Sequence, residues 1–282
     1  CADGHASPLN PNRARARVLT STGMECIAVD WSGALTGAAS RIWIARATSG
    51  VLTALHAPGS RGAVRDALLA RQRDAAPALA GLDFSFGVPA WYASSRGWTT
   101  VCDVWTAARD EGETWLRDCA PPFWGRPDTT RPHDAARGLR TTERIAAAGT
   151  QPKSVFQIGG AGSVGTGSIR GMPMLLELRA AGWAVWPFDD AGPHTLVEIY
   201  PRFFTGAVVK RSANARATWL ERHEPAITAE FRQLMCASED AFDAGVSALR
   251  MTGLDFARAL HASDDPVTRL EGAICGPGAH LA

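Results

Sequence analysis

The stretch CIAVDWSG, residues 26–33, joins a short apolar run to a single carboxylate, Asp30, and then to a turn. The run is bounded by turn residues, so residues 25–31 are predicted to form a buried strand. Burying a lone carboxylate is costly unless it is paired or bound to a metal. The end of this strand therefore indicates a candidate functional acid.

Four further elements follow this strand. Strands are predicted at 41–46 and 51–55, an amphipathic helix at 61–76 and another strand at 79–84. This β-β-β-α-β order, with an acid on the first strand, is the opening of the ribonuclease-H-like fold. We therefore expect an α/β protein whose mixed sheet has three antiparallel strands, then parallel ones, flanked by helices.

The rest of the chain completes one domain, residues 24–282, with an inserted segment at about 90–180. Residues 1–23 are polar and are expected to be a disordered tail, with Met24 as the natural first residue. Further helices are predicted at 98–119, 173–181, 213–221, 225–236, 239–251 and 254–262, and strands at 154–158, 183–188 and 195–200.

Composition excludes several classes of protein. The net charge of +1 gives no broad field for nucleic acid, so any such contact must be local. No apolar run is long enough for a membrane helix, and no membrane partner is expected. Six cysteines without a C-x-x-C pair indicate free thiols in a reducing, cytoplasmic location. The oligomeric state is not indicated.

Four more acids end or follow apolar runs, as Asp30 does: Asp83, Glu198, Asp240 and Asp243. Asp240 and Asp243 are three residues apart on a predicted helix, so they share one face. Carboxylates from strand ends and one helix are the oxygen ligands that Mg²⁺ or Mn²⁺ requires. Two such metals stabilise both the attacking and the leaving oxygen of a phosphodiester.

Each acid also has a simpler interpretation. Asp30 fits a turn after a strand, and Asp83 fits a cap for the turn at Gly87. Glu198 could be an outward strand position. Asp240 could serve only the first turn of its helix, which explains Asp243 less well.

Five segments together resemble the domain of unknown function 429 family, whose members are placed among ribonuclease-H-like proteins and described as predicted nucleases. The segments span nearly the whole predicted domain: AVDWSGA (28–34), LDFSFGVP (82–89), VEIYP (197–201), DAFDA (240–244) and EGAI (271–274). The resemblance implies a first-strand metal ligand at Asp30 and a helix pair at Asp240 and Asp243. It implies that Asp83 and Glu198 supply the remaining ligands or catalytic acids.

A glycine-rich turn at residues 160–165 fits G-x-G-x-x-G between a strand and a helix. The acid that a dinucleotide fold needs lies too far along the chain, so a phosphate-binding nest at Gly160 and Gly162, or a plain tight turn, fits better. The same turn nearly matches G-x-S-x-G, with Asp189 and His194 or His261 as potential partners for acyl transfer.

The inserted segment carries the basic residues Arg140, Lys153 and Arg170 near this turn. We expect them to face the acids and bind substrate phosphates, because an acidic site otherwise repels a polyanion. The sequence thus predicts metal-dependent phosphodiester hydrolysis, with nucleic acid or a phosphate-bearing small molecule as partner. A non-catalytic binding domain on the same fold and an actin-like phosphotransferase remain alternatives.

Overall fold

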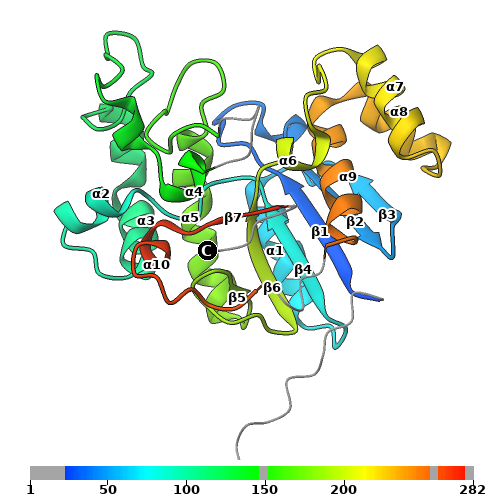
Figure 1. The fold of residues 1–282 in the computed structure, drawn as a ribbon, viewed down its shortest axis with the longest axis horizontal. Coiled ribbons are helices and arrows are strands. Elements are labelled where there is room, and N and C mark those ends of the chain that lie inside the picture. The colour runs from blue at the N-terminus through cyan, green and yellow to red at the C-terminus, as the bar shows by residue number, and fades with distance from the viewer. Residues whose placement is uncertain (1–22, 146–151, 255–259, 277–282) are drawn as a thin grey trace, which may run out of the picture.

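One mixed sheet runs through the computed structural model, which describes residues 23–145, 152–254 and 260–276 (Figure 1). The strand order is β3-β2-β1-β4-β6-β5, and β7 also pairs with β6. β1, β2 and β3 are antiparallel, whereas β4, β5, β6 and β7 continue the sheet in parallel. The expected α/β class and mixed sheet are confirmed. The strands are β1 (Glu25–Asp30), β2 (Trp43–Thr48), β3 (Val51–His56), β4 (Ala78–Leu82), β5 (Ala184–Val185), β6 (His194–Ile199) and β7 (Ile274–Cys275).

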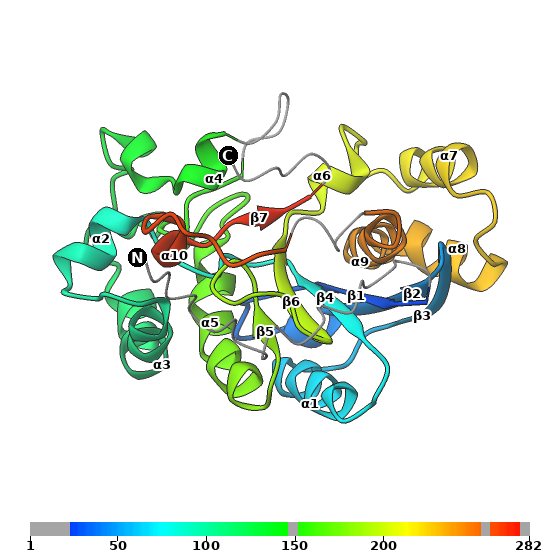
Figure 2. The ribbon, with the colours of Figure 1, turned by 60° about the horizontal axis from the view of Figure 1, so that its bottom comes forward.

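Helices cover both faces of the sheet. Figure 2 shows α9 on one face and α1 and α5 on the other, while α2, α3, α4 and α10 lie to one side. The helices are α1 (Arg61–Gln72), α2 (Ala90–Ser95), α3 (Val101–Asp118), α4 (Thr141–Arg144), α5 (Gly165–Ala180), α6 (Arg202–Thr205), α7 (Ala213–His223), α8 (Ala229–Ala237), α9 (Glu239–Met251) and α10 (Thr268–Glu271), with short 3₁₀ turns at Ala38–Ser40 and Ala135–Gly138.

The central strand β1 sends its side chains alternately into two cores. Ile27 and Val29 pack into the core on the α1 and α5 side, whereas Cys26 and Ala28 pack into the core under α9. Because side chains alternate along a strand, Asp30 continues the second row. The last residue of the strand is therefore directed to the α9 face.

Two expected elements differ in the structure. Residues 154–158 form no strand. Among the described residues they make a single β-bridge, to Trp124, with bonds of 2.9 Å from Trp124 N to Phe156 O and from Ile158 N to Trp124 O. Helix α5 begins at Gly165 rather than 173, so Pro173 lies inside it. The side-chain hydroxyl of Ser168 accepts from Ser85 N at 2.9 Å, which anchors the first turn of α5 to the loop after β4.

Several other expectations can be compared with the described residues. The helices expected at 98–119 and 239–251 are confirmed as α3 and α9, whereas the strand expected at 183–188 is reduced to β5. The expected tail lies outside the described residues, apart from Gly23, as does most of the helix expected at 254–262. The five cysteines in the described ranges are free thiols. Among the described helices, none combines the length and apolarity that crossing a membrane requires.

The loop after β1 meets the start of α5 at very close range. The indole nitrogen of Trp31 donates to Gly167 O at 3.0 Å. A Cβ atom on Gly33 would lie 2.4 Å from both Gly167 N and the carbonyl carbon of Thr166. Only glycine permits this approach, which fixes the loop that follows Asp30.

The first prediction concerns this approach. Replacing Gly33 with alanine forces two backbone segments apart, and we expect a loss of about 1–3 kcal/mol in the free energy of unfolding. Gly62 is the matched control, because a Cβ there meets only Ser60 Oγ at 3.7 Å. Gly62→Ala in helix α1 should be neutral or stabilise by up to about 1 kcal/mol. Urea unfolding of both variants checks this, and equal stabilities would refute the role given to Gly33.

Candidate functional site

Four aspartates lie where β1, the loop after β4 and helix α9 meet. Asp30 and Asp243 are buried, at 8 % and 6 % exposure, and Asp83 and Asp240 are half-buried. The charges of Asp83, Asp243 and Asp240 all act on Asp30, which identifies these residues as one group. We call it the aspartate cluster. It brings together four of the five acids that the sequence predicts.

Strand register explains why these acids converge. Val29 of β1 pairs with Leu82 of β4, and both side chains pack on the α1 side of the sheet. The next residues, Asp30 and Asp83, therefore point to the α9 face. On that face, Ser238 Oγ accepts from Ala241 N at 3.2 Å and caps the start of α9, one turn before Asp243.

Lys210 supplies a positive charge to the cluster. Its ammonium group donates to Asp243 Oδ2, and its side chain is only 19 % exposed. The guanidinium of Arg216 donates to the carbonyl oxygens of Lys210 and Met235, which fixes the lysine beside α8. Asp243 Oδ1 is buried and has no hydrogen-bond partner in the described parts of the chain.

The cluster is short of compensating charge. Burial, with the charges of Asp83 and Asp243, raises the pKa of Asp30 well above its ordinary value. Burial and Asp243 raise the pKa of Asp83 to about 8, against the opposing charge of Lys210. Burial and Glu239 raise the pKa of Asp240 to about 6. Burial also raises the pKa of Asp243, although Lys210 opposes the shift.

The donor chemistry of the cluster suits a hard divalent cation. Carboxylate oxygens are the ligands that Mg²⁺ and Mn²⁺ prefer, and Asp243 Oδ1 is an acceptor without a donor in the described residues. Nevertheless, no three or more His, Cys, Asp or Glu side chains of the described ranges are already arranged to hold a metal ion. The ammonium of Lys210 lies against Asp243 instead.

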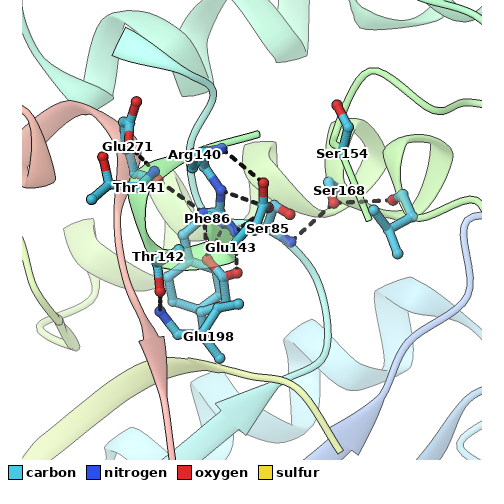
Figure 3. Close-up of polar contacts among 12 residues, drawn as sticks. Ser85, Phe86, Arg140, Thr141, Thr142, Glu143, Ser154, Ser168, Glu198 and Glu271 are labelled. Carbon is cyan, nitrogen blue, oxygen red and sulfur yellow. Dashed lines mark hydrogen bonds and ion pairs between the residues drawn. The ribbon is translucent and has the colours of Figure 1, made fainter. Parts of the chain in front are cut away.

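Glu198 is near enough for its charge to act on Asp83, but its carboxylate is bound by Arg140 and is not grouped with the four aspartates as expected. It pairs with Leu82 across the sheet and so points to the opposite face from Asp30 and Asp83. Figure 3 shows its carboxylate beside Arg140. Glu198 accepts 2.8 Å bonds from Phe86 N and Arg140 Nη1, and a further bond from Arg140 Nη2. Its charge still contributes to raising the pKa of Asp83.

Arg140 is wholly buried, so the substrate-binding role expected for it is not available in this structure. Its Nε donates to Glu143 at 2.9 Å. Its Nη1 donates to Glu198 at 2.8 Å and to the carbonyl oxygen of Glu271 at 2.9 Å. With the bond from Nη2 to Glu198, four of the five guanidinium N–H donors are used, and Nη2 also lies 2.9 Å from Glu143 Oε1 as an ion pair. Burial alone would lower the pKa of Arg140, but Glu143 and Glu198 raise it above its ordinary value.

Glu271 extends the same network to the N-terminal ends of two short helices. Its side-chain oxygens accept from Ala90 N at 2.8 Å and from Thr141 N at 2.6 Å. These are the first residues of α2 and α4, where free N–H groups need acceptors. The buried network therefore ties α2, α4 and α10 to β6.

Arg170 and Lys153 occupy different surroundings. Arg170 donates to Glu113 at 2.6 and 2.7 Å and to the carbonyl oxygen of Gly33, so its guanidinium holds the loop after Asp30 rather than facing a ligand. Lys153 is exposed and packs beside Gly162. Gly160 and Gly162 have φ values of 79° and 71°, which accounts for both as glycines of a tight turn.

The acyl-transfer alternative does not assemble. Asp189 pairs with Arg179 at 2.5 Å, His194 lies 3.3 Å from Arg71, and His261 faces Asp190 at 3.7 Å. His194 begins β6, at the opposite end of that strand from Glu198. In the described residues, no hydrogen bond joins Ser163 to any of these groups.

Sequence reasoning missed Lys210 and Tyr200. Burial and then the charge of Asp83 raise the pKa of Tyr200, which places this residue beside the cluster. Tyr200 directly follows β6, within the segment already quoted for the resemblance. Lys210 lies in no motif, but lysine occurs only twice in an arginine-rich chain, and that rarity was an available signal.

The second prediction is a pH dependence of the metal-free protein. The folded state holds a proton on Asp83 up to about pH 8, whereas the unfolded state releases it near the ordinary value of 3.8. The folded state binds more protons between these values, so its stability falls as pH rises from about 4 to about 8. Asp83→Asn should gain stability relative to the native protein as pH rises, by no more than about 1.4 kcal/mol per pH unit.

Urea unfolding in EDTA at several pH values measures this difference. Glu230→Gln, an exposed acid of α8, is the control and should show a constant difference from the native protein. A stability difference for Asp83→Asn that does not change with pH would contradict the raised pKa.

The third prediction concerns Arg140. Arg140→Met leaves the buried glutamates without their positively charged partner. We therefore expect a loss of about 3–5 kcal/mol in the free energy of unfolding. Arg144→Met, at an exposed position of α4, the helix that Arg140 precedes, should change it by about 0.5 kcal/mol or less. Thermal and urea melts of the pair check this, and similar losses for both would show that the network is not stabilising.

Comparison with known proteins does not supply a family. No family model, curated protein or solved structure matches the chain. The inference of function therefore rests on the aspartate cluster and its surroundings.

Proposed function

We propose that the protein hydrolyses phosphodiester bonds with the help of Mg²⁺ or Mn²⁺ held at the aspartate cluster. Asp30, Asp83 and Asp243 would be the ligands, with Asp240 at the edge of the site. The observation that carries this proposal is the gathering of three carboxylates on one face, two buried and one half-buried, with one lysine as their close partner. Such an excess of buried negative charge needs a cation or bound protons.

The arrangement of the strands supports the same proposal. The order β3-β2-β1-β4-β6 and the acids at the end of β1, after β4 and on α9 agree with what the ribonuclease-H-like resemblance implies. A divalent cation at this position would stabilise negative charge on the oxygens of a phosphodiester. Glu198, Arg140 and Arg170 are not part of the proposed site, because other groups of the chain already bind them.

Lys210 has a defined part in this proposal. Its ammonium offsets one negative charge and competes with a cation for Asp243. We therefore expect moderate metal affinity in the native protein. Removing the ammonium with Lys210→Met should strengthen metal binding, because Asp243 then has no competing partner.

A non-catalytic binding domain is the second candidate. Two observations favour it. Lys210 is paired with Asp243, and in the described residues no group of three or more His, Cys, Asp or Glu side chains is arranged to hold a metal ion. In that case the raised pKa values mean that protons, rather than a metal, neutralise the cluster.

The fourth prediction separates the two candidates. Mn²⁺ should raise the melting temperature of the native protein in a concentration-dependent way, since it binds only the folded state. Asp30→Asn should lose that shift, yet melt at the same or a higher temperature in EDTA, because one repelling charge is gone. Glu230→Gln should behave like the native protein in both conditions.

Hydrolysis provides the second readout. Bis-(4-nitrophenyl) phosphate and labelled single- and double-stranded DNA and RNA are suitable substrates. We expect cleavage with Mn²⁺ that EDTA abolishes and that Asp30→Asn lowers by about 100-fold or more. A melting shift without cleavage of any substrate would contradict hydrolysis but keep the metal site. If Mn²⁺ gives no melting shift and no cleavage, the metal site is excluded and the non-catalytic domain is favoured.

A further inference from the structure

A cavity lies away from the aspartate cluster, between α2 and the loop that precedes α4. It has a volume of about 430 Å³ and shares no lining residue with the cluster. Four aromatic side chains form much of its wall: Trp91, Tyr92, Trp124 and Phe156. Its size falls in the range of small-molecule sites, roughly 300–1,000 Å³.

The aromatic walls are held in place by hydrogen bonds and ring contacts. The indole nitrogen of Trp91 donates to Arg137 O at 2.6 Å. The backbone of Trp124 bonds to Phe156 and Ile158 at 2.9 Å on both sides. Tyr92 and Phe156 pack edge to face with ring centres 5.0 Å apart. A flat ring could therefore enter a preformed slot with little reorganisation.

Polar groups accompany the apolar walls. Arg137 lies over the ring of Trp91 at 4.4 Å and lines the cavity with Asp134. The hydroxyl group of Tyr92 has no hydrogen-bond partner within the described ranges. Such groups can bond the edge of a heteroaromatic ring that stacks on the aromatic walls.

A neighbouring hollow of about 450 Å³ shares Trp124 with this cavity. Arg131 and Lys153 line it, and none of the described lining residues is a carboxylate. Arg131 lies over the Trp124 ring at 5.5 Å. The two hollows therefore place an aromatic slot beside a cationic recess, with one tryptophan lining both.

We propose that this pair of hollows binds a nucleotide. The base stacks in the slot of Trp91, Trp124 and Phe156, and its phosphate is bound by Arg131 and Lys153. Charge and lining agree with this ligand, because four aromatic side chains line the first cavity and the recess carries two cations. The site does not depend on the metal proposed for the aspartate cluster.

Calorimetric titration in EDTA tests the proposal with AMP, adenosine and inorganic phosphate as probes. AMP should bind more tightly than adenosine, and added salt should weaken AMP binding but not adenosine binding. Replacing Arg131 and Lys153 together with alanine should weaken AMP binding about tenfold or more and leave adenosine binding unchanged. Both positions are exposed, so the fold should be retained.

Trp124→Leu should weaken binding of both AMP and adenosine, and Arg144→Ala is the charge control that should change neither. A fully folded protein that binds no probe at millimolar concentration overturns the proposal. The proposal is also overturned if AMP binds with unchanged affinity to the double variant of Arg131 and Lys153 and to Trp124→Leu, because the ligand then binds elsewhere.

The source of the nucleotide is distinguished with a 5′-phosphorylated trinucleotide. Tighter binding than AMP, lost in the same variants, identifies the end of a nucleic-acid strand. Affinity equal to that of AMP identifies a free nucleotide. Since EDTA is present throughout, failure here is independent of the metal-site test.

Discussion

Buried carboxylates on neighbouring strands need positive partners, and this requirement organises both faces of the sheet. On one face, Glu198 and Glu143 receive the guanidinium of Arg140, and they also accept from the backbone N–H groups of Phe86 and Arg140 respectively. On the other face, Asp30, Asp83 and Asp243 receive one ammonium, from Lys210. The first group is internally satisfied, so it is structural. In the second group, Asp243 Oδ1 is buried without a hydrogen-bond partner in the described residues and the charges of the aspartates repel one another, which is the physical reason for assigning the functional site to it.

The satisfied network also positions the proposed nucleotide site. Glu271 accepts from the first backbone N–H of α2, next to Trp91, and from that of α4. Arg140 directly follows the segment that contributes Arg137 to the cavity wall and connects that segment to Glu198 in β6. The aromatic slot is thus attached to the central sheet by buried ionic contacts, and Figure 1 places these elements together beside the sheet.

Much of the sheet and its main helices could be predicted from the sequence, because apolar periodicity determines them locally. The antiparallel start, the parallel strand after α1 and the whole of α9 follow from that pattern. Glu198 was misplaced because the face of the sheet to which its side chain points depends on its register with Leu82. A shift of one residue along a strand moves the side chain to the opposite face. The burial of Arg140 depends on partners 58 and 131 residues away, which no local pattern reveals. Lys210 was missed for the same reason, since it meets Asp243 across 33 residues.

The central claim is that the aspartate cluster takes a divalent cation. Diffraction from a crystal soaked in Mn²⁺, recorded with anomalous scattering, tests it most directly. We expect an anomalous peak within coordination distance of oxygens of Asp30, Asp83 and Asp243, and no peak in the same place for Asp30→Asn. A crystal with Mn²⁺ elsewhere, the cluster empty and Lys210 still bound to Asp243 would contradict the claim.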